Sequence, residues 1–356
     1  MAYYFLTASK DASIYLQQPN QNTGFDEILE ISKIYYGSVK DVSHCLIKFD
    51  TGYISKSISD GTIKLADSTL ILKETKSEEI PLEYTIYANP ISGSWEMGMG
   101  TRFDNITTTG VTWNYREGDS KLEWVENGFE VNTTSSINNG VGGVWYTNYE
   151  ASQTFNYQTA DINMDVKSIL RAWMSSSIQN NGFILKYSNS NESDTQDYGI
   201  LKFFSKETNT IYQPKIRIGW DDQSFLTGSL LELTEDDIKI GITNLKKEYK
   251  AGTEVKFKIF GRELYPLKTF TNTFSYNTIK SLPQTTYYQI KDVNSDDVII
   301  PFSDYSKVSC DSNGNYIKIN FSNWEAGRTY KIEFKVNING GTQYFDEDIT
   351  FDLIKD

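Results

Sequence analysis

The sequence predicts an all-β protein, a jelly-roll-like β-sandwich followed by a smaller immunoglobulin-like β-sandwich. Apolar and polar residues alternate with a period of two along many short segments, as expected for half-buried strands. Turn-forming Gly, Asn, Asp and Pro residues separate these segments. Aromatic residues make up 14% of the chain, with 24 tyrosines and 19 phenylalanines, and rings suit a pleated surface that is buried on one side.

The alternating segments define the expected elements. In the first part of the chain we expect strands at 13–16, 29–31, 45–50, 69–73, 82–88 and 241–245, with turns at 19–20, 22–24, 59–61 and 138–140. In the second part we expect strands at 255–261, 287–290, 316–321, 330–336 and 349–353, with a hairpin turn at 337–341. One helix is expected at 165–173, because its apolar residues at 166, 169, 170 and 173 share a helical face. Asp165 is its expected N-cap, and the helix is expected to cover one end of the sandwich.

The length of the chain predicts two domains, because 356 residues exceed the roughly 250–300 that one core accommodates. A polar stretch at 246–252 marks the expected boundary. We therefore predict one domain at 1–245 and another at 246–356, and the second has about the length of an immunoglobulin-like sandwich.

Charge and rare residues narrow the function. The net charge of -13 gives an acidic surface that repels phosphate backbones, so nucleic acid is not an expected partner. No stretch approaches the ~20 apolar residues that span a bilayer, so no membrane partner is expected. The single histidine, His44, argues against histidine-based triads and metal clusters. Cys45 and Cys310 fall in different predicted domains and are expected to be buried free thiols.

No catalytic machinery is expected. The sequence lacks nucleophile-elbow, phosphate-loop and dinucleotide-binding motifs. Adjacent acids occur at 221–222, 236–237, 296–297 and 346–348, where we expect turns whose carboxylates face water rather than a cleft. We therefore predict a protein that is not an enzyme and assign no catalytic residue, metal ligand or cofactor. Structural calcium remains an alternative at 189–194 and 296–297, where side chains offer hard oxygen ligands.

The seven tryptophans are expected to pack in the cores, because large rings supply much of the buried area in such sandwiches. The alternative is an exposed ring that stacks on a sugar. Trp113 and Trp124 are the candidate carbohydrate-contact residues under that alternative.

Several segments of residues 1–225 share their order with a known module. They are 7–15 (TASKDASIY), 20–24 (NQNTG), the strand pair 29–31 (LEI) and 43–50 (SHCLIKFD), 94–100 (SWEMGMG), 110–113 (GVTW), 142–146 (GGVWY), the helix 165–173 (DVKSILRAW), 180–186 (NNGFILK) and 201–222 (LKFFSKETNTIYQPKIRIGWDD). This order resembles the DNRLRE-type β-sandwich module of tailed-bacteriophage structural proteins. The closing segment is the most specific. The pair His44-Cys45 departs from the pattern, because the module usually carries a basic residue near the start of that strand.

The resemblance implies a jelly-roll-like sandwich used in virion assembly. We therefore predict a virion structural protein at the head surface, neck, tail or fibre attachment, which contacts other virion proteins and copies of itself. Residues 1–5 lack the basic start of a signal peptide, which fits assembly in a host cytoplasm. The rival hypothesis is a carbohydrate-binding or host-adhesion module, because bacterial relatives of the module occur on surface-attached proteins and some bind polysaccharide.

Overall fold

The computed structural model describes residues 2–52, 54, 65–107, 109–126, 128–136, 139–156, 160–220, 225–266, 279–322 and 324–355. Strands make up 51% of the structure and helices 6%, in several antiparallel sheets consistent with sandwich packing. The predicted all-β class is therefore confirmed. The chain divides into two compact units, a first unit at Phe5–Ile218 and a second unit at Gly219–Asp356 together with Met1–Tyr4.

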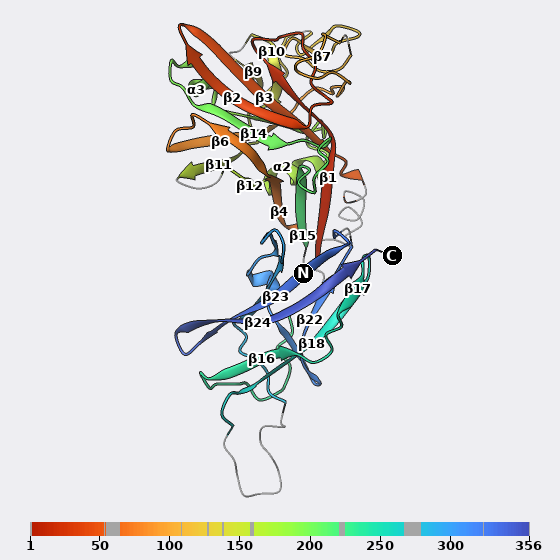
Figure 1. Ribbon diagram of the computed structural model, residues 1–356, viewed down its shortest axis with the longest axis vertical. Coiled ribbons are helices and arrows are strands. Elements are labelled where there is room, and N and C mark those ends of the chain that lie inside the picture. The colour runs from red at the N-terminus through yellow and green to blue at the C-terminus, as the bar shows by residue number, and fades with distance from the viewer. Residues whose placement is uncertain are drawn as a thin grey trace, which may run out of the picture. The chain divides into compact units, whose positions relative to one another are not determined.

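Eleven strands form one hydrogen-bonded network that includes the sheets of the first unit. Its main path runs β11-β6-β13-β3-β1-β15-β4-β12, while β2 joins β3 to β14 and β14 pairs in turn with β5. Figure 1 shows β2, β3 and β14 side by side. The strands are β1 Ala2–Tyr15, β2 Ile28–Tyr36, β3 Val39–Phe49, β4 Leu65–Leu72, β5 Glu74–Glu78, β6 Glu83–Pro90, β11 Ala151–Asn156, β12 Ile162–Asp165, β13 Phe183–Lys186, β14 Gly199–Phe204 and β15 Lys215–Trp220.

Two small ladders complete the first unit. They are β7 Tyr115–Glu117 with β8 Leu122–Glu123, and β9 Thr133–Ser136 with β10 Val141–Tyr146. All four strands belong to the long connection between β6 and β11.

The burial of each strand follows its place in the sheet. In β6, which has β11 and β13 as neighbours, Tyr84, Ile86 and Ala88 are buried while the residues between them are partly exposed. All four residues of β13 are buried, because it lies between β3 and β6 with both faces covered. On one of these faces the Trp173 ring, from a helix, packs 4.6 Å from the Phe183 ring between centroids.

That helix, α2 Lys167–Met174, confirms the predicted helical segment. It buries four residues, Ile169, Leu170, Ala172 and Trp173. The predicted N-cap was wrong, because Val166 occupies the cap position without a side-chain bond. Asp165 lies one residue earlier, where its Oδ1 still accepts a hydrogen bond from the Lys167 backbone N–H at 2.9 Å. A second helix, α3 Asn189–Ser193, was not predicted. Within the described residues, no helix has the length and apolar character needed to cross a membrane.

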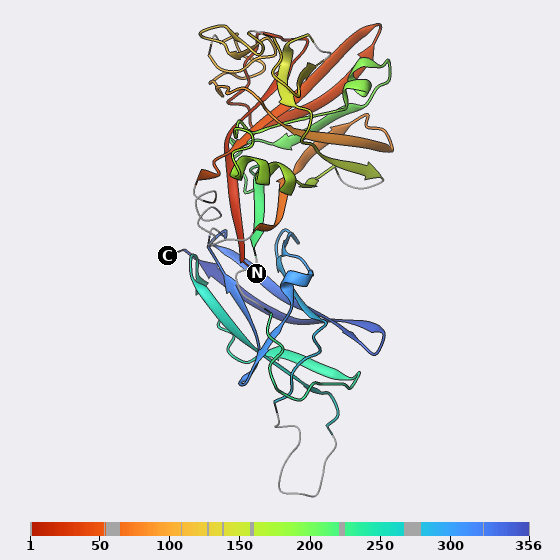
Figure 2. The same cartoon turned by 180° about the vertical axis from the view of Figure 1, so that it is seen from behind.

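The second unit has the strand order of an immunoglobulin-like sandwich. One sheet runs β16-β18-β22-β21 and the other β17-β24-β23-β19-β20, with β17 parallel to β24. With β16 and β17 as the split first strand, this is the ABED and GFC arrangement. The elements are β16 Ile238–Ile242, β17 Glu248–Lys250, β18 Glu254–Glu263, β19 Thr286–Asp292, β20 Val298–Ile300, η2 Asp304–Ser306, β21 Ser309–Asp311, β22 Gly314–Asn320, β23 Arg328–Ile338 and β24 Gly341–Ile354. Figure 2 shows the long β23–β24 hairpin in blue.

A tyrosine corner supports this assignment. Tyr330, near the start of β23, is buried, and its hydroxyl donates to the Glu325 carbonyl at 2.9 Å. That geometry is typical of the sixth strand in immunoglobulin-like domains. Beneath it, the rings of Tyr249, Phe257 and Phe351 pack with centroids 5.3–5.9 Å apart. A ring-rich core thus takes the place of a disulfide.

Every segment expected as a strand overlaps an observed strand. The predicted hairpin turn is confirmed, because Asn339 and Gly340 both have positive φ between the paired residues Ile338 and Gly341. The strand expected at 241–245 begins earlier, at Ile238, and pairs with β18, so it belongs to the second unit rather than to a domain that ends at 245. The turn expected at 59–61 lies outside the described residues.

Candidate functional site

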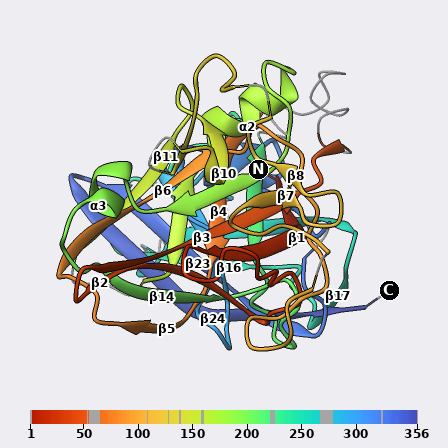
Figure 3. The same ribbon diagram turned by 90° about the horizontal axis from the view of Figure 1, so that it is seen from above.

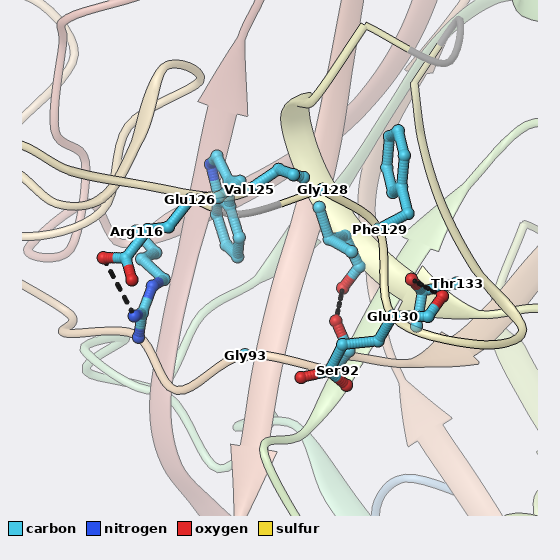
Figure 4. A pocket seen from close by; sticks show the side chains of 11 residues that line it. Ser92, Gly93, Arg116, Val125, Glu126, Gly128, Phe129, Glu130 and Thr133 are labelled. Atoms are coloured by element: carbon cyan, nitrogen blue, oxygen red, sulfur yellow. Dashed lines mark hydrogen bonds and ion pairs between the residues drawn. The ribbon is translucent and has the colours of Figure 1, made fainter.

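Two adjoining pockets lie in the first unit, along the loops between β6 and β10. The larger has a volume of about 460 Å³ and the smaller about 440 Å³. Val125, Gly128 and Phe129 line both and separate one from the other. Figure 4 shows the larger pocket, with Phe129 and Glu130 on one side and Arg116 on the other. Each volume is within the range that holds a small ligand.

The pocket lining is acidic and carries one exposed ring. Arg116 is the one cation among the described lining residues, against Glu123, Glu126 and Glu130. Its guanidinium donates to the carbonyl and hydroxyl oxygens of Ser94 at 3.1 Å and lies 3.7 Å from the Glu126 carboxylate. The Phe129 ring is 43% exposed. The pockets therefore offer an apolar ring, carboxylate acceptors and a tethered guanidinium donor.

A buried asparagine holds the loop that precedes the pockets. The Asn22 amide nitrogen donates to the carbonyls of Met97 and Val111 at 2.8 and 2.7 Å, and its Oδ1 accepts from the Gly100 N–H at 2.8 Å. Glycine is required at Gly98, where φ is +79° and an added Cβ would lie 2.4 Å from the Asn22 Oδ1. The glycines noted in the sequence as part of a motif thus leave room for the Asn22 side chain.

The tryptophans lie mostly inside the cores. Trp113 is 1% exposed and packs in the hydrophobic cluster of the first unit with Trp95, Trp124 and Trp145. Trp124 is 6% exposed, lines the larger pocket, and donates its indole N–H to the Thr112 carbonyl at 3.2 Å. Their proposed role in carbohydrate contact stays a prediction. The exposed ring at the pockets is Phe129, which the sequence did not single out.

A buried ionic cluster in the first unit is centred on His44, the only histidine of the sequence. The His44 Nε2 lies 2.9 Å from Glu192 Oε1, and its Nδ1 lies 2.8 Å from the Gly142 carbonyl oxygen. Lys186 Nζ lies 3.2 Å from the same Oε1, and the Ser136 hydroxyl donates to Oε2 at 3.2 Å. The side chains of His44 and Glu192 are fully buried, and that of Lys186 is 3% exposed. Figure 3 shows α3, which carries Glu192, beside β3, which carries His44.

Mutual attraction decides the charges of this cluster. Burial alone would raise the pKa of Glu192, but the charges and hydrogen bonds of His44 and Lys186 outweigh it and hold that pKa below its usual range. Burial lowers the pKa of Lys186, and the nearby Glu192 carboxylate opposes part of this shift. The Lys186 ammonium also donates to the Tyr187 carbonyl and to Asn189 Oδ1, both at 2.6 Å. All three of its hydrogens therefore have acceptors.

The segment expected as a calcium alternative uses its oxygens otherwise. Residues 189–193 form α3, where Asn189 and Glu192 accept hydrogen bonds from Lys186. Asp194 pairs with Lys33 at 3.3 Å. Lysines thus occupy the place that a cation would take in this segment. Within the described part of the chain, no three Asp, Glu, His or Cys side chains are placed to hold a metal ion.

None of the adjacent acids that the structure describes is among the residues that line the two pockets. Asp236 is exposed and accepts from the Asn339 amide at 2.8 Å, and Asp296 is an exposed turn residue with φ of 56°. Residues 346–348 are exposed as expected, but they lie within β24 at a register shift rather than in a turn. Asp221 and Asp222 lie outside the described residues. Cys45 and Cys310 are free and buried, as predicted, and burial raises the pKa of both thiols.

Comparison with protein-family models finds none that matches the chain, and comparison with curated proteins finds no match either. The resemblance to the DNRLRE-type module therefore rests on the sequence segments alone and stays a prediction.

Proposed function

We propose that the protein is a structural, non-enzymatic component of a tailed-phage virion, which acts through contacts with other virion proteins and with copies of itself. The phage assignment rests on the order of sequence segments that resemble phage versions of the module. The observation that supports a contact role is an exposed apolar surface on two loops of the first unit.

This surface, the loop patch, consists of Phe25, Met99, Phe103 and Ile106. These side chains are 47%, 70%, 89% and 66% exposed. The two loops touch, because the Phe25 backbone N–H donates to the Gly100 carbonyl at 2.9 Å. Large apolar side chains gathered in water are unfavourable unless a partner covers them, and such patches mark interaction sites.

The loop patch is held in a fixed conformation. Arg102, next to Phe103, donates to the buried Glu30 carboxylate at 2.7 Å, and its guanidinium lies 4.1 Å from the centroid of the Tyr15 ring. The Arg102 backbone N–H also donates to Asp26 at 3.2 Å. A loop ordered before binding loses little conformational entropy when a partner docks, which favours its use as a contact.

The test is incorporation into virions. Purified particles of the encoding phage should contain the chain in a fixed ratio to the major capsid protein by mass spectrometry. The double variant Phe103→Ser, Ile106→Ser should lower incorporation about tenfold or more, because each side chain loses an apolar contact worth ~1–2 kcal/mol. Leu82→Ser, which alters a side chain 69% exposed elsewhere in the first unit, is the matched control and should incorporate normally. Particles that lack the chain would refute the proposal.

A second candidate function is carbohydrate binding at the two pockets. The supporting observation is the exposed Phe129 ring between two polar hollows, since a sugar places an apolar face on a ring and its hydroxyls toward acceptors. Three glutamates against one arginine favour neutral over anionic sugars. A glycan array should then show neutral binders whose affinity falls about tenfold in Phe129→Ala, while Phe103→Ala binds normally. An array without binders would remove this candidate.

A further inference from the structure

The hydrogen bonds around His44 determine where its protons lie. The Gly142 carbonyl can only accept, so the Nδ1 atom at 2.8 Å must carry a hydrogen. One proton must also lie between Nε2 and Glu192 Oε1, because two bare acceptors 2.9 Å apart would repel each other. Glu192 already accepts from Lys186 and Ser136, and a carboxyl group with several donors favours its ionised form. The shared proton therefore belongs to Nε2, and His44 is an imidazolium.

We propose that the buried His44 imidazolium, bridged by Glu192 to Lys186, is a charged latch that holds the β9–β10 ladder against the sheet of β3 and β13. His44 is on β3 and reaches β10 through the Gly142 carbonyl. Glu192, on α3, reaches β9 through the Ser136 hydroxyl. Removal of the His44 proton places a lone pair against the carboxylate and breaks the bridge.

Two tryptophans make the buried cations tolerable. The His44 ring lies 4.9 Å from Trp113 between centroids, and Lys186 Nζ lies 4.6 Å from the centroid of the Trp145 ring. The π face of an aromatic ring attracts a cation, most strongly when water is excluded. Two cations and one anion leave a net positive charge in the core, and the two rings spread part of it. Trp113 and Trp145 thus have an electrostatic role beyond packing.

The latch connects to the pockets through the same ladder. Thr133 of β9, together with Val141 and Val144 of β10, lines them. The charged groups that face the latch are Glu192 from α3 and Lys186 from β13, and Glu150 acts on Lys186 at longer range. Among its described residues, the ladder contributes uncharged partners, the Ser136 hydroxyl, the Gly142 carbonyl and the Trp145 ring.

The decisive measurement uses the unmodified chain. Because His44 is the only histidine, ¹⁵N-histidine labelling gives one pair of ring-nitrogen signals that needs no assignment. In the folded chain both ring nitrogens should show the chemical shifts of a protonated imidazolium. In Glu192→Gln the same ring should become neutral. A neutral ring in the unmodified chain would overturn the proposal.

Hydrogen exchange tests whether the latch holds the β9–β10 ladder in place. Glu192→Gln should speed amide hydrogen exchange in β10 about tenfold or more, measured against β23 of the second unit as an internal reference. Ser136→Ala removes one hydrogen bond of the latch and should speed the same exchange by less. Ser43→Ala is the matched control, because it removes a buried hydroxyl that bonds Ser32 and the Glu30 carbonyl but does not touch the ladder. Unchanged β10 exchange in Glu192→Gln, or equal acceleration in Ser43→Ala, would refute the latch.

Discussion

Replacement of Asp11 by asparagine is expected to remove a large part of the pH dependence of the first unit. Asp11 is on β1 and is 1% exposed, and its Oδ2 accepts a hydrogen bond from the Lys206 backbone N–H at 2.5 Å. Burial raises the pKa of this carboxyl group to about 7, because the charged form loses its hydration. An asparagine oxygen accepts the same bond without a charge.

The sign and size follow from proton linkage. The pKa of Asp11 is 3.8 when unperturbed and about 7 in the folded protein, so between these values the folded chain binds more protons than the unfolded chain. The stabilisation is therefore complete below about pH 4 and is lost as pH rises through about 7. A shift of about three units corresponds to about 4 kcal/mol at ~1.4 kcal/mol per unit. The Asp11→Asn variant has no carboxyl group at this position, so its free energy of unfolding should not show this decrease as pH rises.

Urea unfolding between about pH 4 and pH 8, followed by tryptophan fluorescence, measures the effect. The signal reports mainly on the first unit, which holds Trp95, Trp113, Trp124, Trp145 and Trp173. Burial also raises the pKa of Glu30 and Asp26, so the difference between variant and unmodified chain is the quantity to follow. The exposed Asp119→Asn should behave like the unmodified chain. Parallel curves for Asp11→Asn and the unmodified chain would refute the reasoning.

Three further outcomes test the fold. Gly98→Ala should lower the free energy of unfolding by more than about 2 kcal/mol in thermal unfolding, because the new Cβ would clash with Asn22 and φ is positive. Gly37 also has positive φ but has nothing within 4 Å of an added Cβ, so Gly37→Ala should lower it by about 1 kcal/mol. Tyr330→Phe should destabilise the second unit by about 1–2 kcal/mol through loss of the corner hydrogen bond, whereas the 68% exposed Tyr344→Phe should not. Both cysteines should resist a thiol reagent until urea unfolds the chain, and reaction in the native state would contradict their burial.

The strands could be predicted from local patterns because apolar and polar residues alternate wherever one face of a sheet is buried and the other is exposed to water. In β23 alternate residues are buried from Tyr330 to Ile338, and the sequence alone indicates this strand. The domain boundary was harder to place. Ile238, the first residue of β16, pairs with Glu263 of β18, which is 25 residues later in the chain. The local composition around 246–252 does not indicate this pairing.

The N-cap error has a similar origin. Asp165 has the residue type that N-caps favour, and it does bind the first turn of α2. Asp165 is the last residue of β12, and there it pairs with Thr69 of β4. The helix therefore begins one residue later than its capping preference predicts. Sheet pairing thus overrides local capping preference.

The candidate site could be predicted least, because its residues come together only through tertiary contacts. Phe129 lines the larger pocket together with Val125 and Gly128, and no period in the sequence marks it as an exposed ring. His44 and Glu192 are separated by 148 positions, so no local sequence pattern indicates that they are in contact. A single histidine does argue against histidine triads, but it leaves open a histidine that acts as a fixed charge.

The ionic cluster gives a physical reason for the contacts of Trp113 and Trp145 with His44. A buried cation without compensation costs several kcal/mol, and one carboxylate cannot neutralise both His44 and Lys186. Aromatic faces supply the remaining attraction without adding a group that could itself lose or gain a proton. A second carboxylate would also neutralise the cluster, but it would add another buried group that needs hydrogen-bond donors. A core built from Trp113, Trp145 and a lone histidine thus keeps a charged group in contact with the ladder that borders the pockets.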